Sequence, residues 1–184
     1  MLRKTSLAIL VGLSFSALAS AQEGFRQHDA HVHGQVEFNI AQDGHDLLLE
    51  ITAPGADVVG FEHAPENTEQ ENQLKAAVEK LSQADLMVQI NEAAKCTIEN
   101  VSVTHTLGGE EHEHHDDHGH EHDGHGAFTV EYQYHCDNVA ALNALETDWF
   151  KQFPATQAIQ ANVLTDKVQS ALALSPAHNT VSLK

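Results

Sequence analysis

The chain has 184 residues, which is enough for one compact domain of ordinary size. It contains 27 acidic residues but only 9 Lys and Arg residues, giving a formal net charge of −18 at pH 7. A charge of this sign repels nucleic acids and anionic membrane surfaces and attracts cations, so we expect no nucleic-acid partner. The 15 histidines can offer neutral ring nitrogens to metal ions near pH 7.

Residues 1–21 have the pattern of a secretory signal peptide. Two basic residues precede an apolar run from Leu7 to Leu18, and Ala19-Ser20-Ala21 matches a cleavage motif. The run is too short to span a bilayer, so we expect no stable membrane insertion. We therefore expect export, to the periplasm, with residues 22–184 as a single domain. An uncleaved N-terminal anchor is the alternative.

The first part of the domain is predicted to contain a hairpin and a helix. Apolar and polar residues alternate over 36–40 and 47–51, which predicts two strands joined by the turn Gln42-Asp43-Gly44. A loop is expected over residues 56–65. From Thr68 to Ala84, apolar residues recur at spacings of three and four, which predicts a helix capped by Asn67 or Thr68.

The second part is predicted to consist mainly of strands. Residues 86–90 alternate as a short strand, and residues 95–105 and 128–134 predict another hairpin. A second helix is expected over 138–153, ended by Pro154. Further strands are expected over 158–165, 168–174 and 180–183. Strands and helices do not alternate regularly. The predicted fold class is therefore α+β, with an antiparallel or mixed sheet, two helices and one long disordered His-rich loop.

Cys96 and Cys136 are the two cysteines of the chain. An even number of cysteines in an exported protein predicts one disulfide, which would join the two strands of the second hairpin at one end. Two thiolate metal ligands are the alternative.

The segment Gly108–Gly126 contains only Gly, Glu, Asp and His. Without apolar residues it cannot contribute to a core, so we expect it to be disordered in the absence of metal. Its seven histidines and seven carboxylates could bind about one to three zinc ions. Imidazole also suits copper and nickel, and a solvated acidic linker is the alternative without metal. The candidate ligands of this loop are His112, His114, His115, His118, His120, His122 and His125.

Four further histidines predict a second, more rigid metal site in the folded body. His31 and His33 lie two residues apart and face the same way if the segment is extended. His28 lies three residues before His31, and His63 follows Glu62 on a loop. The remaining histidines, His45, His105, His135 and His178, are expected to be surface or packing residues.

Several motifs in this order resemble the ZrgA-like zinc-regulated periplasmic proteins. These are residues 31–34 followed by the hairpin with Asp43-Gly44, residues 59–65 followed by a helix with an acidic start, the Cys-flanked loop, and residues 149–154. The resemblance implies a periplasmic zinc-binding protein of Gram-negative bacteria that acts in zinc acquisition or homeostasis. It also implies a role beside an ABC-type zinc importer or its periplasmic binding protein, with His31, His33 and His63 as ligands in the folded body.

The sequence thus predicts a monomeric protein that binds Zn²⁺ and supplies it to an import system. A periplasmic buffer or storage protein for nickel or copper is the alternative. We expect no enzymatic activity, because the chain has no His-Glu-x-x-His helix and no nucleophile motif. Glu62, beside His63, is the only candidate for the general base of a zinc hydrolase.

Overall fold

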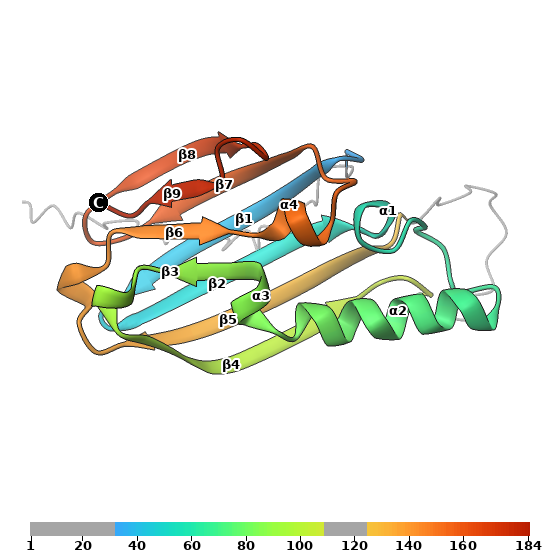
Figure 1. Cartoon of the computed structure of the whole chain (residues 1–184), viewed down its shortest axis with the longest axis horizontal. Coiled ribbons are helices and arrows are strands. Elements are labelled where there is room, and N and C mark those ends of the chain that lie inside the picture. The colour runs from blue at the N-terminus through green and yellow to red at the C-terminus, as the bar shows by residue number, and fades with distance from the viewer. Residues whose placement is uncertain (1–31, 109–124) are drawn as a thin grey trace, which may run out of the picture.

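A computed structural model describes residues 32–108 and 125–184 (Figure 1). The predicted signal peptide, His28, His31 and the loop histidines before His125 lie outside these ranges. The prediction that the His-rich loop is disordered is therefore not tested.

A six-stranded sheet forms the larger layer. Strands β1 (Gln35–Asp43) and β2 (Asp46–Pro54) form the first predicted hairpin, and β4 (Cys96–His105) pairs with β5 (Ala127–Cys136) as the second. The sheet order is β4-β5-β2-β1-β7-β8, where β7 is Ala158–Leu164 and β8 is Gln169–Leu174. β1 and β7 are parallel and the other neighbours are antiparallel, which confirms the expected mixed sheet of an α+β fold.

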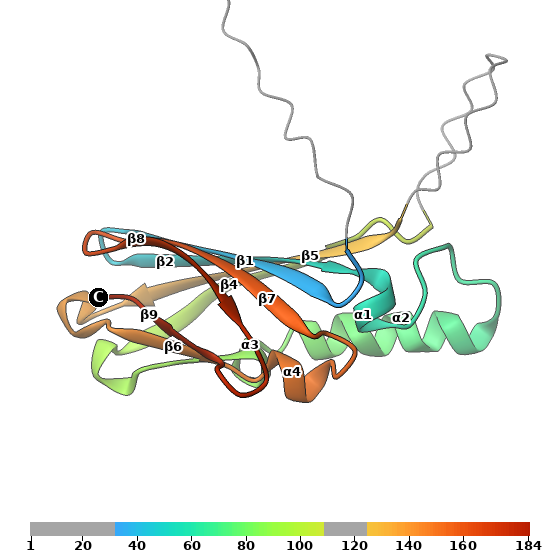
Figure 2. The same ribbon diagram turned by 90° about the horizontal axis from the view of Figure 1, so that it is seen from above.

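A second layer covers one face of this sheet (Figures 1 and 2). It contains a three-stranded sheet and the helices that lie beside it. The strands are β3 (Val88–Ile90), β6 (Ala144–Thr147) and β9 (Thr180–Ser182). The helices are α2 (Thr68–Leu81), α3 (Ala84–Met87) and α4 (Trp149–Gln152). The predicted helix is confirmed from its start, where the Asn67 side chain accepts a hydrogen bond from the Gln70 amide, but it ends at Leu81 rather than at Ala84, which begins α3.

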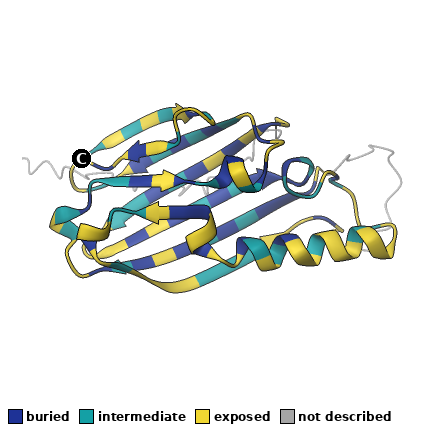
Figure 3. Ribbon diagram, in the orientation of Figure 1, coloured by how far each residue is buried: buried dark blue, intermediate teal, exposed yellow. Residues whose placement is uncertain are grey.

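The core lies between the two layers. Buried and exposed residues alternate along the strands of the large sheet (Figure 3), as expected for strands with one covered face. Val36, Phe38 and Ile40 of β1 point into the core. The Trp149 ring packs edge-to-face on Phe38 with ring centroids 5.8 Å apart, which joins the second layer to the centre of the sheet.

The predicted helix over residues 138–153 is wrong. This segment contains a short 3₁₀ helix (Val139–Ala141), β6 and only one turn of α-helix, α4. The spacing of Leu142, Leu145 and Trp149 fits a helix, but tertiary pairing decides otherwise. β3 and β9 provide strand partners on both sides of β6, and the Asn91 side chain accepts hydrogen bonds from the amides of residues 143 and 144.

Two local predictions also need correction. The strand expected over 86–90 begins only at Val88, because Leu86 belongs to the single helical turn α3. The loop expected over 56–65 begins with another helical turn, α1 (Gly55–Val58). The described residues thus contain four α-helices rather than two, three of them only four residues long. None of the helices in the described part of the chain is both long and apolar enough to span a membrane.

The predicted disulfide between Cys96 and Cys136 is confirmed. It joins directly paired residues of β4 and β5 and closes a loop with a sequence separation of 40. We expect the double variant Cys96→Ala/Cys136→Ala to lose about 3–4 kcal/mol in free energy of unfolding, because the unfolded chain regains the entropy of that loop. Urea unfolding measures this loss. Dithiothreitol should destabilise the wild type similarly and leave the variant unchanged; equal stability of both proteins would contradict the prediction.

Candidate metal centre

Three chain segments meet at one end of the large sheet. β2 lies between β1 and β5 and is antiparallel to both, so its end lies beside the starts of β1 and β5. His33 lies two residues before β1 and His125 two residues before β5. Glu62 lies on the loop that follows β2 and α1. The topology therefore brings two histidines and a carboxylate together at this edge.

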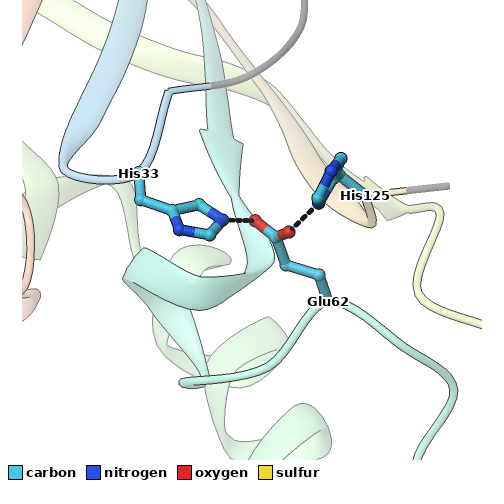
Figure 4. A group of neighbouring side chains, drawn as sticks. All are labelled: His33, Glu62 and His125. Atoms are coloured by element: carbon cyan, nitrogen blue, oxygen red, sulfur yellow. Dashed lines mark hydrogen bonds and ion pairs between the residues drawn. The ribbon is translucent and has the colours of Figure 1, made fainter. Parts of the chain in front are cut away.

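These three side chains point toward one another (Figure 4). The His33 Nε2 atom lies 3.0 Å from Glu62 Oε1, and the His125 Nδ1 atom lies 2.5 Å from Glu62 Oε2. One nitrogen or oxygen atom from each residue lies within 4.8 Å of the other two. In the described residues this is the only group of three or more His, Cys, Asp or Glu side chains that is this close.

Glu62 is the least exposed residue of the group. Its side chain is 12% exposed, whereas those of His33 and His125 are 62% and 52% exposed. The Oε1 atom is buried and has no hydrogen-bond partner of suitable geometry among the described residues, although the His33 ring nitrogen is close. A buried carboxylate oxygen without a partner is unfavourable. A cation between the oxygen and the ring nitrogens would remove this cost.

Burial and the two histidines shift the pKa of Glu62 in opposite directions. Burial raises the pKa of its carboxyl group, because desolvation disfavours the charged form. The close contacts and positive charges of His33 and His125 lower the pKa, and together they outweigh the burial. The net result is a pKa below the usual 4.5, so Glu62 is an anion near neutral pH.

Two backbone hydrogen bonds of Gly126 hold the Glu62 loop beside His125. The Gly126 amide donates to the Glu62 carbonyl oxygen at 2.9 Å, and the Gly126 carbonyl accepts from the Gly55 amide at 2.7 Å. A Cβ atom at residue 126 would lie 2.5 Å from the Glu62 carbonyl oxygen, and one at residue 55 would lie 2.5 Å from the Phe61 carbonyl oxygen. Only glycine permits so close an approach at both positions.

His33 is positioned by the turn that precedes β1. Gly34 has a φ of +81°, and its amide donates to Asp57 Oδ1 at 2.8 Å. Asp57 is buried, and its other oxygen accepts from the Thr156 hydroxyl. That hydroxyl in turn accepts from the Trp149 indole nitrogen. A buried hydrogen-bond network thus connects the turn carrying His33 to the core.

This donor set fits a zinc ion. Zinc binds imidazole nitrogen and carboxylate oxygen at about 2.0–2.2 Å, which places neighbouring ligand atoms of a tetrahedron about 3.4 Å apart. The present distances of 3.0 and 2.5 Å require only small shifts of side chains, two of which are mostly exposed. The His125 Nδ1–H group donates a hydrogen bond to the Glu62 carboxylate, and a metal ion would take the place of that hydrogen. Three protein ligands leave the fourth position open.

The structure brings together His33 and His125, which the sequence analysis assigned to two different sites. His63 is not a member of this group: its Nδ1 atom lies 2.7 Å from the Ala64 carbonyl oxygen, and its ring stacks on Phe61. His28, His31 and the other six loop histidines lie outside the described residues.

The sequence analysis missed Glu62 as a ligand candidate and considered it only as a possible base. Its neighbour Phe61 is buried, whereas His63 is exposed. The apolar Phe61 beside Glu62 was therefore a signal that this part of the loop packs against the body.

The comparisons with known proteins are consistent with a metal centre. The family model described as "ZrgA family zinc uptake protein" matches residues 30–183, which include all three residues of the group. The search of curated proteins finds no match.

The electrostatics of the metal-free site give a testable pH dependence. Because the folded-state pKa of Glu62 is lowered, the ionised carboxylate contributes stability that is present above pH 4.5 and is lost as the pH falls through the lowered pKa. In the double variant His33→Gln/His125→Gln, we expect the pKa of Glu62 to rise above that of the wild type, since burial then acts unopposed. A ¹³C NMR titration of the Glu62 carboxyl carbon measures both values. An unchanged pKa would show that the histidines do not contact the carboxylate.

Proposed function

The chain belongs to the ZrgA family of zinc uptake proteins, and on this basis we propose that it captures Zn²⁺ in the periplasm and supplies the ion to a zinc import system. The observation that carries the proposal is the His33–Glu62–His125 group, in which two imidazole nitrogens face a carboxylate whose buried oxygen Oε1 has no hydrogen bond of suitable geometry among the described residues. The family favours zinc over nickel or copper, which the same donor types would also bind.

In this proposal the group holds one ion in a form that can be released. Glu62 supplies a fixed negative charge, and the two exposed histidines supply neutral nitrogen ligands. The open fourth position accepts water or an incoming ligand from the next protein. The same open position occurs in hydrolytic zinc sites, but we propose transfer of the ion rather than catalysis. Loss of a measured turnover in Glu62→Gln would instead support a hydrolase.

The loop histidines are proposed to collect zinc for this group. His125 is the last histidine of the loop and lies directly before Gly126, whose backbone is hydrogen-bonded to Glu62 and Gly55. An ion bound along the loop would therefore reach the body at the point where the fixed ligands lie. His28 and His31 precede His33 in the same way on the other segment. The negative charge of the chain raises the local concentration of cations around both segments.

The location and the partner belong to the same proposal. The basic start, apolar run and cleavage motif of residues 1–21 support export, and a zinc uptake family fits a protein that acts outside the cytoplasm. The receiving partner is proposed to be an ABC-type importer or its periplasmic binding protein. The monomeric state remains a prediction.

The variant Glu62→Gln tests the fixed site. Glutamine keeps the size of the side chain but removes its charge, so we expect zinc affinity at the tightest site to fall about 100-fold or more. Loss of a direct ligand should exceed the 10–100-fold typical of residues that only orient a ligand. Competition with a chromophoric chelator, using the mature protein, measures this affinity.

Glu66→Gln is the matched control, because Glu66 is exposed and lies near His63 outside the group. It should leave the tightest affinity unchanged, and an equal loss in both variants would refute the assignment. The variants His63→Asn and His125→Asn separate the two ligand sets, because His63 belongs only to the body site expected from the sequence and His125 only to the group seen in the structure. The same competition run with Ni²⁺ and Cu²⁺ tests the alternative of a nickel or copper buffer.

Deletion of residues 109–124 tests the loop. It removes six histidines but keeps His125, so we expect the number of bound zinc ions to fall by about one to three while the tightest site remains. Calorimetry gives both quantities. A second variant, in which the six histidines become asparagine, keeps the loop length and should lose the same ions. Unchanged stoichiometry in both variants would show that the loop does not bind zinc.

A further inference from the structure

A second pair of histidines lies at the opposite end of the large sheet. His45 is in the turn between β1 and β2, and His135 is near the end of β5. Their rings stack with centroids 5.6 Å apart and planes inclined by 22°. β1 separates this end from His33 by nine residues, or about 30 Å of extended strand (Figure 1). The pair is therefore distinct from the group around Glu62.

The hydrogen bonds of both rings determine which nitrogen is free. His45 Nδ1 lies 2.9 Å from the Cys136 carbonyl oxygen, and His135 Nδ1 lies 2.8 Å from Asp46 Oδ1. A carbonyl and a carboxylate can only accept here, so each Nδ1 carries the proton and each neutral ring has its lone pair on Nε2. Metal-binding histidines are commonly held this way, with one nitrogen donating to an oxygen and the other facing the ion.

The atoms that orient the two rings are themselves fixed. Cys136 is held by the disulfide to Cys96, and its amide donates to the His45 carbonyl oxygen at 2.8 Å. Asp46 and His135 are directly opposite each other in the register of β2 and β5. The turn, two strands and the disulfide therefore keep the two imidazoles side by side, while both rings remain accessible from solvent.

The surroundings favour a cation. The carboxylates of Asp46, Glu99 and Asp137 lie near His135 and act on its charge. These carboxylates create a negative potential at the pair and offer oxygen ligands or orienting acceptors.

We propose that His45 and His135 form a second, weaker binding site for a divalent transition-metal ion, with the two Nε2 atoms as ligands and water completing the coordination. Imidazole ligands select ions of the Zn²⁺, Cu²⁺ and Ni²⁺ class over Ca²⁺ and Mg²⁺. The rings have to tilt so that their Nε2 atoms approach to about 3–4 Å around one ion, given metal–nitrogen bonds of about 2.0–2.1 Å. This site does not depend on the function proposed for the Glu62 group.

Zinc titration of the mature, disulfide-bonded protein, followed by ¹H–¹⁵N NMR, tests this proposal. After the tightest site is filled, further zinc should shift the amide signals of Gly44, His45, Cys136 and Asp137. We expect His45→Gln and His135→Gln each to weaken this response about tenfold or more, and Asp46→Asn to weaken it about tenfold. His178→Gln is the control, because this exposed histidine lies elsewhere and should leave the response unchanged.

Three results would overturn the proposal. The first is the absence of shifts at this end of the sheet with zinc in large excess. The second is an equal response in wild type and both glutamine variants, with unchanged thermal stability showing that they are folded. The third is the disappearance of the shifts on deletion of residues 109–124, which would assign the zinc to the loop. The signals of Glu62 and Gly126 report the first site separately, so failure of either proposal is recognised independently.

Discussion

The close approach of backbone at Gly126 is the constraint on which the metal centre depends. Its amide and carbonyl bind the Glu62 loop on one side and Gly55, directly after β2, on the other. Both contacts need a residue without Cβ, since a side-chain atom at residue 126 or 55 would collide with backbone oxygens. Backbone hydrogen bonds, together with the packing of the buried Phe61, therefore set the positions of the segments that carry Glu62 and His125. Binding of an ion then requires only movements of side chains, and little of its binding energy is spent on ordering these two segments.

The antiparallel order β5-β2-β1 places histidines at both ends of the sheet. At one end, the strand starts carry His33 and His125, and the loop after β2 adds a buried carboxylate. At the other end, the turn and the end of β5 carry His45 and His135, and the nearby Asp46 is exposed. The two ends thus have similar nitrogen donors but differ in dielectric surroundings. A buried charge attracts an ion more strongly than an exposed one, so the end with Glu62 is expected to bind more tightly.

The sequence predicts much of the fold, because alternation over a strand records which face is covered. Both hairpins could be inferred in this way, whereas α2 was inferred from apolar spacings of three and four and the disulfide from the even number of cysteines. The segment containing Leu142, Leu145 and Trp149 could not, because these residues fit a helix equally well. Its strand forms only because β3 and β9 lie on both sides, and such long-range pairing leaves no local signal.

The residues of the candidate site could be predicted only in part, again because long-range contacts bring them together. Histidines at 33 and 125 stand out by composition, whereas Glu62 is one of many acidic residues, and its role depends on a contact with Gly126 over 60 residues away in sequence. From the sequence, the adjacent His63 was therefore predicted as the ligand instead of Glu62. The backbone places Glu62 instead between the two imidazoles, and no spacing rule connects these three positions.

The division between one largely buried and two exposed donors suits the proposed role as a carrier of zinc. A structural zinc site is closed by four protein ligands and exchanges its ion slowly. In the proposed centre, the exposed imidazoles can rotate away one at a time as incoming ligands enter the open position, while Glu62 retains the ion until the exchange is complete. Because only small side-chain motions are needed, the barrier to transfer can be low even where the affinity is high. The direction of transfer then depends on the receiving site binding zinc more tightly than the His33–Glu62–His125 group.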